Sequence, residues 1–468
     1  MNTIIHQLAM DLAKKICERA EAGELSELGV MADEVLEDCK RTSVEMMQAI
    51  IAYLNDELRK DKAFRKEQGL TIKERNRPRS LLTILGQINF SRDYYSDKES
   101  GCHRAVLDQM LGIGRYERVA DAVGARLVNQ ATDCSYAKSA QIVTGGAVSR
   151  QTVRNKLLKT NIPEMQPKEE GREVPCLHIY ADEDHVHMQK PGKAKGKQSK
   201  MVPLVTVTEG TSAVSRTRNK TVNPMHFTDE DLDPKNLWKS VEGYIEKAYD
   251  MDKIASIYVH GDGGGWIRNA LTDYEQTKHV VDGFHFYRDL KSVARILPHR
   301  HVRVALVNAL KRDDRGRAEE YIQDLLESEL NEKEREKICE FRTQLLGSWA
   351  KIRRRIVEDI PGSCTEGQIS HVMSKRLSRD PIGWSEAALG KMACARVYRE
   401  NGGELTSKDL REEAADETYS QYAERISEEY LKGAFDFSIF EPELPIMDGS
   451  SGTQILLDKI GRPKSLLA

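Results

Sequence analysis

Three acidic residues each follow an apolar stretch of the sequence, where a carboxylate could do chemistry. Asp182 lies in Tyr-Ala-Asp-Glu-Asp-His, Asp262 in His-Gly-Asp-Gly-Gly-Gly-Trp, and Glu366 in Cys-Thr-Glu-Gly-Gln-Ile-Ser-His. Such positions place a carboxylate at the edge of a core rather than on a solvated helix face. A single Asp at a strand end is commonly a turn or cap residue. It is therefore the set of three that favours a functional site.

Carboxylates that converge from separate elements favour the binding of hard divalent cations. Mg²⁺ prefers oxygen ligands and keeps several of its waters. Two such ions about 3.5–4 Å apart can hold the attacking and leaving oxygens of a phosphodiester. Asp184 lies two residues after Asp182 and could be an accessory ligand, because alternate residues of a strand share a face. We therefore expect Mg²⁺, with Mn²⁺ as a substitute, at Asp182, Asp262 and Glu366.

Histidines also gather near these acidic residues, at positions 185, 187, 260 and 285. A His-x-His pair with carboxylates could bind Zn²⁺. The alternative is that these side chains are structural or contact a substrate, and for His285 we expect an auxiliary role of that kind.

The elements that must position these residues begin at residue 174. Apolar segments predict strands at 174–186, 201–210, 220–227, 253–263 and 278–286. Helical patterns separate the last three, and another helical stretch runs from 287 to about 360. This order predicts an α/β domain with a partly parallel sheet, over residues 174–400. The strand ends of such a sheet are where a site is expected.

Residues 1–160 form a mostly helical region in the sequence pattern, with a small β-hairpin at about 81–95 around Gly86-Gln87. Residues 135–158 have the pattern of a helix-turn-helix, with a Gly-Gly break and Ser149 as the cap of the second helix. Such a helix can lie in the major groove of DNA, although any short helix pair with a basic face looks similar. Its candidate DNA-binding residues are Arg150, Gln151, Arg154 and Lys156. Two prolines and a charge cluster make 161–173 a predicted linker.

A basic segment follows the first strand of the α/β domain and would flank the site. Arg and Lys contacts to phosphates supply affinity for DNA without reading its sequence. A solvated basic loop is the alternative. The DNA-binding candidates in this segment are Lys193, Lys195, Lys197, Lys200, Arg216 and Arg218. Trp266 and Trp384 could stack on an unpaired base, or they could pack in the core.

The composition is that of a soluble globular protein. The chain has 468 residues, of which 31% are charged and 39% are hydrophobic, and its formal net charge is −3. That charge alone argues against nucleic-acid binding. Residues 404–443, however, hold twelve acidic and four basic residues, which leaves +5 for the rest. The acidic C-terminal region, 401–468, could be a solvated helical face or could restrain DNA binding.

The sequence also argues against several classes of protein. No run of about 18 apolar residues predicts a membrane span, and the first residues do not resemble a signal peptide. The eight Cys are scattered without a Cys-x-x-Cys pair, which argues against a disulfide framework. We therefore expect a cytoplasmic protein without a membrane partner.

With these residues in place, the chain resembles bacterial insertion-sequence transposases of the ISLre-two family, which are distantly similar to Mutator-like and other Asp-Asp-Glu transposases. The resemblance covers nearly the whole chain, and its last block is the most specific. The motifs are Tyr-Ala-Asp182-Glu-Asp-His-Val-His, Gly-Asp262-Gly-x-x-Trp266-Ile, Asp282-x-Phe284-His285, and Cys364-Thr-Glu366-Gly-x-x-Ser-His371 with Arg376, Arg379 and Gly383-Trp384-Ser385. Arg376 and Arg379 are accordingly expected to contact DNA.

This resemblance implies a ribonuclease-H-like catalytic domain with an all-helical insertion at about 287–360. It also implies that Asp182, Asp262 and Glu366 bind two Mg²⁺ ions, nick double-stranded DNA at transposon ends, and join the freed 3′-hydroxyl to target DNA. Synapsis of two ends implies a homo-oligomer. Two departures matter: Asp282-Gly-Phe-His285 stands where Mutator-like enzymes have Cys-x-x-His, and Glu386 is a rival for Glu366.

Three other functions remain open on the sequence alone. A metal-dependent nuclease of the same fold would share the carboxylates but lack strand transfer. A domesticated protein would bind DNA without cleaving it. A zinc hydrolase would use the histidines.

Overall fold

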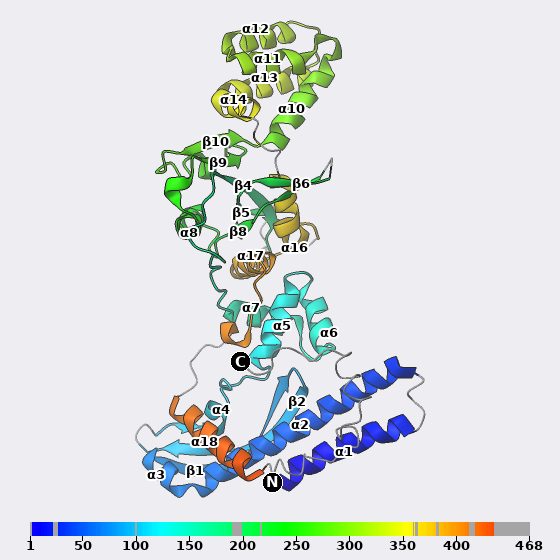
Figure 1. Ribbon diagram of the computed structural model, residues 1–468, viewed down its shortest axis with the longest axis vertical. Coiled ribbons are helices and arrows are strands. Elements are labelled where there is room, and N and C mark those ends of the chain that lie inside the picture. Colours follow the sequence, from blue (N-terminus) through cyan, green and yellow to red (C-terminus); the bar gives the residue numbers. More distant parts are fainter. Residues whose placement is uncertain are drawn as a thin grey trace, which may run out of the picture. The chain divides into compact units, whose positions relative to one another are not determined.

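The computed structural model describes residues 2–21, 27–98, 101–189, 199–215, 218–358, 360, 364–380, 383–410 and 417–434 (Figure 1). The chain divides into two compact units, one made of Met1–Val123 with Glu412–Ala468 and the other of Gly124–Arg411. In the described part of the chain, no helix is long and apolar enough to span a bilayer.

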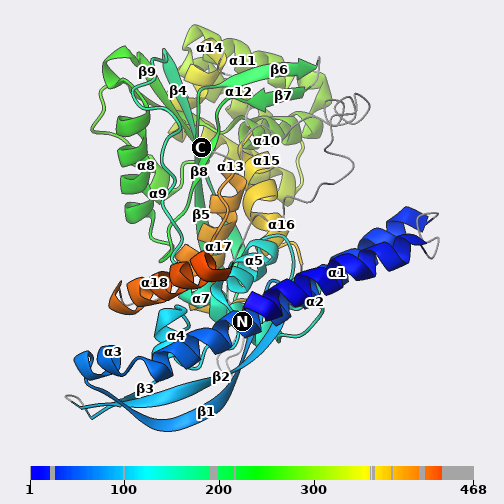
Figure 2. The ribbon, with the colours of Figure 1, turned by 60° about the horizontal axis from the view of Figure 1, so that its bottom comes forward.

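The first unit consists of a long helix pair, a β-hairpin and short helices. Figure 2 shows α1 running alongside α2. The elements are α1 (Asn2–Glu21), α2 (Leu28–Lys60), α3 (Lys62–Glu67), β1 (Leu70–Thr83), β2 (Gly86–Asp97), β3 (His103–Arg104), α4 (Val106–Met110) and α18 (Glu417–Ala434).

The β-hairpin of this unit is longer than the sequence pattern predicts. Its strands β1 and β2 pair from Leu70↔Asp97 to Thr83↔Gly86, so the turn is at 84–85 rather than around Gly86-Gln87. The Thr83 hydroxyl donates to the Gly86 carbonyl at 2.8 Å and closes the turn. In β1, eight of the residues that precede Leu81 are exposed and give no apolar alternation, so the sequence pattern shows a strand only from 81 onward.

Part of the acidic C-terminal stretch is a packed helix. Tyr419, Tyr422 and Ile426 of α18 are buried in the core of the first unit. The ring of Tyr422 stacks on that of Phe64, with 3.8 Å between centroids. The solvated-face alternative therefore describes only one side of α18, while residues 435–468 lie outside the described part.

The second unit holds a short helical segment, a five-stranded sheet and a helical insertion. Its first elements are α5 (Asp121–Ala131), α6 (Tyr136–Thr144), α7 (Arg150–Lys159), β4 (Cys176–His187), β5 (Ser199–Thr208), β6 (Thr211–Ser215), β7 (Arg218–Thr221), β8 (Met225–Phe227), α8 (Pro234–Ala248), η2 (Met251–Lys253), β9 (Ser256–Gly261), α9 (Gly265–Arg268) and β10 (Thr277–Val281). The rest are α10 (Gly283–Ile296), η3 (Pro298–Arg300), α11 (Val302–Arg312), α12 (Arg315–Leu326), α13 (Glu332–Gly347), α14 (Trp349–Val357), α15 (Thr365–Gln368), the π-helix η4 (Ile369–Ser374), α16 (Lys375–Leu377), α17 (Glu386–Glu400) and η5 (Ser407–Leu410).

The sheet is mixed, with the strand order β10-β9-β4-β5-β8. The β4 strand lies at its centre, parallel to β9 and antiparallel to β5, and β10 is parallel to β9. The prediction of a mixed α/β fold is thereby confirmed. One predicted strand, 278–286, ends at Val281, because Asp282 caps a helix that starts at Gly283.

The helix α8 covers one face of the sheet. Its start follows the expected chemistry, since the Asp233 side chain caps it and Pro234 occupies the first turn. Leu237, Val241 and Ile245 recur at helical spacing and are fully buried. They pack in one core with the apolar residues of β4, β5 and β9.

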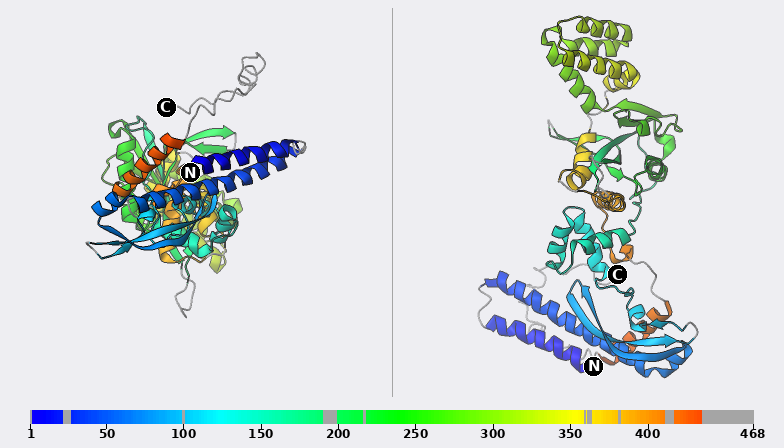
Figure 3. Two further views of the ribbon diagram at one scale, coloured as in Figure 1. Left: turned by 90° about the horizontal axis from the view of Figure 1, so that it is seen from below. Right: turned by 180° about the vertical axis from the view of Figure 1, so that it is seen from behind.

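The helices α10–α14 have a core of their own, made of residues such as Phe286, Leu310, Ile338 and Leu345. Figure 3 shows these green-to-yellow helices gathered in one bundle. They occupy the stretch where the helical insertion is predicted. The predicted linker at 161–173 lies inside the second unit, because Arg172 bridges to Tyr249 and Asn161 bonds to Asp409 through the backbone.

Candidate metal centre

Asp182 lies on the central strand of the sheet, beside the end of β9. Tyr180 of β4 pairs with His260 of β9, and continuing that register two residues places Asp262 level with Asp182. At Gly261 a Cβ would lie 2.9 Å from the Ile267 side chain, so glycine leaves room for that side chain. Asp262 is exposed and its Oδ1 accepts from the backbone N–H of Gly264 at 2.8 Å.

His285 lies in the first turn of α10, which Asp282 caps. The Asp282 Oδ2 accepts from the backbone N–H groups of Phe284, at 3.1 Å, and His285, at 3.4 Å. A cap of this kind satisfies amide groups that have no partner within the helix. The cap therefore fixes the position of His285 in the first turn of the helix.

Glu366 lies in the short helix α15, and a π-helix follows it at Ile369–Ser374. Single turns of π-helix are rare and occur often at functional sites. Thr365, next to Glu366, is buried, while Glu366 itself is exposed. The sequence therefore anchors the segment through Thr365 and leaves the carboxylate of Glu366 available.

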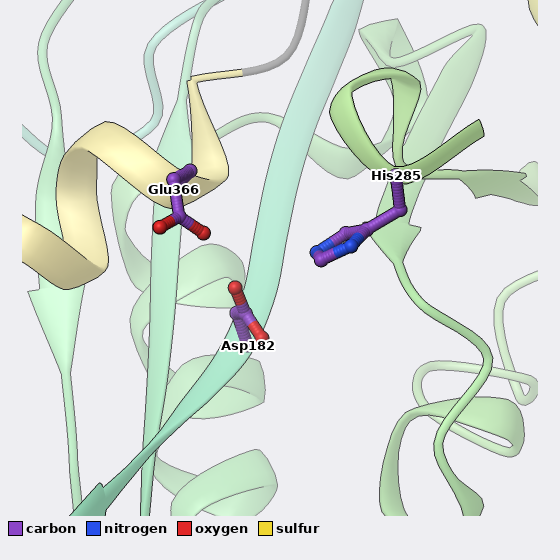
Figure 4. Close-up of side chains that lie close together, drawn as sticks. All are labelled: Asp182, His285 and Glu366. Atoms are coloured by element: carbon purple, nitrogen blue, oxygen red, sulfur yellow. The ribbon is translucent and has the colours of Figure 1, made fainter. Parts of the chain in front are cut away.

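These three side chains converge from different elements (Figure 4). One ligand atom from each of Asp182, His285 and Glu366 lies within 4.8 Å of the others. Asp262 is not a member of this group. The structure thus brings together two of the three predicted carboxylates with His285, which the sequence pattern treats as auxiliary.

The electrostatics of the cluster centre on Asp182. Burial raises the pKa of Asp182 to about 6, the hydrogen bond from the Glu183 amide and the charge of His285 oppose the rise, and the charges of Asp262 and Glu183 add to it. Burial disfavours an ionised carboxylate unless a positive charge compensates it. A bound cation would supply that charge.

The donor set fits a divalent cation. Carboxylate oxygens suit Mg²⁺ and Mn²⁺, while an imidazole nitrogen suits later transition metals. Two carboxylates and one imidazole within mutual reach would hold Mn²⁺ readily, and Asp262 lies beside them to add negative charge.

Cation binding is expected to depend on pH through Asp182. A proton competes with a metal ion for a carboxylate, and the folded-state pKa of this one is raised to about 6. Mn²⁺ affinity should therefore be full well above pH 6 and should fall at least tenfold per pH unit below about 6. Isothermal titration between pH 5 and 8 measures this. A pH-independent affinity across that range would rule out Asp182 as a ligand.

The histidines of the zinc alternative are not brought together among the residues that the structure describes. His260 is fully buried, bonded to His178 at 3.1 Å and to Arg355 at 2.9 Å. His185 and His187 are exposed, and neither joins the cluster of Asp182, His285 and Glu366.

The two rival carboxylates lie elsewhere. Asp184 is buried, and its Oδ1 accepts from the Ser378 hydroxyl at 2.9 Å, so it is not in the cluster. Glu386 begins α17 and forms an ion pair with Lys200. Lys200 is thereby paired within the protein, although it was predicted to contact DNA.

Trp266 and Trp384, the two candidates for stacking on a base, pack against other parts of the protein. The indole N–H of Trp266 donates to Glu183 at 2.6 Å, and its ring lies against the core under the sheet. Trp384 is 3% exposed, and its indole N–H donates to the Leu377 carbonyl at 2.9 Å. Core packing, rather than stacking on a base, describes these rings.

The predicted helix-turn-helix corresponds to α6 and α7. Ser149 caps α7 as predicted, accepting from the Thr152 amide at 3.2 Å. Arg150 and Gln151 are exposed, whereas Lys156 is half-buried and Arg154 donates to Ser385 at 3.2 Å. Of the basic segment, Lys193, Lys195, Lys197 and Arg216 lie outside the described residues, as does the side chain of Arg218.

Arg376 cannot contact DNA as predicted, because its side chain is buried. It is 5% exposed, its Nε donates to the Ala131 carbonyl at 2.7 Å, and its guanidinium lies 4.7 Å above the Trp384 ring. The burial of Arg376 depends on aromatic neighbours that lie far apart from one another in the sequence. The motif alone therefore does not show it. Arg379, three residues on, is exposed and donates to Ser370 at 2.8 Å.

Buried basic residues were the main group that sequence reasoning missed. Arg355 ends the basic run Lys351-Ile-Arg-Arg-Arg355, a sequence typical of a surface, but is 5% exposed. Arg396, 2% exposed, donates to the carbonyls of His371 and Val372. The spacing of apolar residues in α14 and α17 was the available signal, since both arginines lie on the apolar sides of these helices.

Comparison with known proteins shows a family match and a distant likeness to a solved structure. A model described as "Uncharacterised protein family (UPF0236)" matches residues 22–414. Two UPF0236 proteins of Caldanaerobacter subterraneus subsp. tengcongensis are each 33% identical over 408 residues, covering 86% of this chain and 84% and 80% of their own. A third is 34% identical over 363 residues, covering 77% of this chain and 75% of its own.

Among solved structures, the "Drosophila P element transposase strand transfer complex" is similar at a TM-score of 0.17 and 11% identity, covering 65% of this chain and 85% of that chain. A likeness at this TM-score carries no argument about fold or activity.

Proposed function

Because the chain belongs to the uncharacterised protein family UPF0236, whose description assigns no activity, we propose its function from its site. It is a DNA transposase that cleaves transposon ends and joins them to target DNA. The observation that carries this proposal is the convergence of Asp182, on the central strand, with His285 and Glu366. The ISLre-two family is the group whose motifs it resembles.

The surroundings of the cluster support a ribonuclease-H-like catalytic domain. A mixed five-stranded sheet carries Asp182, and an all-helical segment, α10–α14, lies between β10 and Glu366. Both features are those that the resemblance implies. Asp262, level with Asp182 in register, completes the acidic set without being a member of the tight cluster.

The names of the relatives also support a mobile element. One relative's name joins eleven numbered designations of the same organism, and another joins four. Several designations for one protein are what repeated copies of a gene produce. An element that copies or moves itself within a genome leaves such repeats.

In this proposal the side chains of the cluster have separate tasks. Asp182, His285 and Glu366 would hold a divalent cation, Mg²⁺ or Mn²⁺, and Asp262 would add charge or hold a second one. When bound, such a cation supplies Lewis-acid activation of a hydroxyl group at a phosphodiester. The exposed face of α7 would bind the DNA backbone or groove, with two chains joined so that two ends can be synapsed.

A joining assay tests the proposal. The substrate is a duplex that carries the DNA flanking the gene of this protein, supplied with a target plasmid and Mg²⁺. We expect nicked ends and a covalently joined product, both abolished by a chelator. Cleavage without joining would favour a nuclease of the same fold, and binding without cleavage a domesticated DNA-binding protein.

Replacing Arg150 tests the DNA-binding role of α7. Arg150 is exposed at the start of the helix, where a phosphate contact is available. We expect Arg150→Ala to weaken DNA binding and to reduce the slope of log affinity against log salt by about 1. Fluorescence anisotropy over a salt series measures both. The matched control is Arg335→Ala on the exposed face of α13, and an equal effect of both variants would count against α7 as the interface.

A further inference from the structure

We propose that Asp282 is a positioning residue that sets His285 and Glu366 in register, through the hydroxyl of Thr365, so that both can reach one cation. The inference deepens the proposed function and rests on the cation site that it assumes. Asp282 does not join the cluster of Asp182, His285 and Glu366, and no role has been given to its side chain beyond capping.

The two oxygens of Asp282 face different segments of the chain. Oδ2 accepts from the amides of Phe284 and His285, at 3.1 and 3.4 Å, and so fixes the first turn of α10. Oδ1 accepts from the Thr365 hydroxyl at 3.0 Å. One carboxylate thus joins the helix that carries His285 to the residue that precedes Glu366.

The backbone of Asp282 adds a third connection. Its N–H donates to the Gly261 carbonyl at 2.9 Å, and Gly261 precedes Asp262. Asp282 therefore contacts a residue next to, or the backbone of, each of Asp262, His285 and Glu366. Since Asp282 is 1% exposed and Thr365 is 3% exposed, water does not compete for these bonds.

A buried carboxylate of this kind needs a counter-charge, and Arg355 supplies it. The guanidinium of Arg355 is 5% exposed, and its Nε donates to the carbonyl of Val281, next to Asp282. Burial lowers the pKa of Arg355. The negative charge of Asp282 opposes this fall more strongly than any other group does. A Cβ at Gly283 would lie 2.9 Å from the Arg355 guanidinium, so glycine leaves the space for it.

The segments that Asp282 joins are otherwise separate in the sequence. Between β10 and α15 lie the helices α10–α14 with their own core. Without a fixed link between these segments, the position of Glu366 relative to His285 would depend on how the chain returns to the site after this helical insertion. Partners of this kind, which touch ligands rather than the metal, typically change metal affinity by about 10- to 100-fold when they are removed.

Removing the Thr365 hydroxyl tests this role without altering a proposed ligand. Thr365→Val keeps the shape of the side chain and removes the donor to Asp282, whereas Thr365→Ser keeps the donor. We expect Thr365→Val to raise the dissociation constant for Mn²⁺ about tenfold or more, and Thr365→Ser to stay within about twofold of the native chain. Calorimetric titration of the full chain with Mn²⁺ measures this, without DNA.

The matched control is Thr132→Val. Thr132 is fully buried, and its hydroxyl donates to the Asn129 carbonyl at 2.7 Å rather than to Asp282 or to a member of the cluster. It should leave Mn²⁺ affinity unchanged. If Thr365→Val does not fold, Thr365→Ala removes the same hydroxyl without added bulk.

The outcomes separate the two proposals. Native-like Mn²⁺ affinity in a folded Thr365→Val or Thr365→Ala, or failure of Thr365→Ser to retain it, overturns the role of Asp282 and leaves the proposed function intact. Mn²⁺ binding by the native chain without any DNA cleavage overturns the proposed function and leaves the positioning role. A native chain that binds no Mn²⁺ overturns both.

Discussion

Asp182→Asn is expected to abolish DNA cleavage, lowering its rate by at least about 10³-fold, while DNA affinity stays within about twofold. The substitution keeps the shape of the side chain and removes the negative charge that a cation needs. Asp182 is the member of the cluster that lies on the central strand β4. This strand pairs with β5 on one side and with β9 on the other.

The same variant should fold normally. Burial already disfavours the ionised form of Asp182, whose pKa is raised to about 6, so a neutral amide should not destabilise the metal-free chain at pH 7.5. Gel-based nicking, DNA anisotropy and thermal unfolding are measured side by side. The control is Asp273→Asn, an exposed Asp of the same unit, which should cleave normally. Retained nicking by a folded Asp182→Asn would remove Asp182 from the site.

Arg396→Ala is expected to lower the free energy of unfolding by about 3–5 kcal/mol, because it leaves several buried backbone carbonyls without their donor. Arg396 lies on α17, is 2% exposed, and forms ion pairs with Asp133 and Glu400. It also donates to the carbonyls of His371, at 2.9 Å, and Val372, at 3.0 Å, in the π-helix that follows Glu366.

Those two carbonyls explain the size of the effect. The wider turn of a π-helix interrupts the usual helix hydrogen bonds, and buried carbonyls without a donor are costly. Urea unfolding of the native chain and the variant measures the difference. The control Arg335→Ala, on an exposed face of α13, should change stability by no more than about 0.5 kcal/mol. A loss below about 1 kcal/mol for Arg396→Ala would show that the π-helix does not depend on it.

The strands and their order of appearance were predictable because β4, β5 and β9 are buried apolar runs that end in polar residues. Asp182 was identifiable for the same reason. The end of the fifth strand had one signal in the sequence. Asp282 interrupts the apolar residues Val280, Val281 and Phe284, and its side chain caps α10.

The composition of the site was less predictable than its location. His285 enters the cluster and Asp262 does not, because the first depends on the angle of α10 and the second on a turn in which the Asp262 carboxylate accepts from Gly264. The angle of α10 has no local signature, whereas the turn at Asp262 is one that a single Asp at a strand end commonly forms. Arg376 and Trp384 were assigned to DNA or base contacts from a motif, but tertiary packing buries both.

The central claim is that Asp182, His285 and Glu366 hold one divalent cation. Anomalous diffraction from a crystal of the protein grown with Mn²⁺, collected near the manganese absorption edge, tests it most directly. We expect an anomalous peak within bonding distance of the Asp182 and Glu366 carboxylates and a ring nitrogen of His285. An ordered site without such a peak, or a peak held instead by His185 and His187, would contradict the claim.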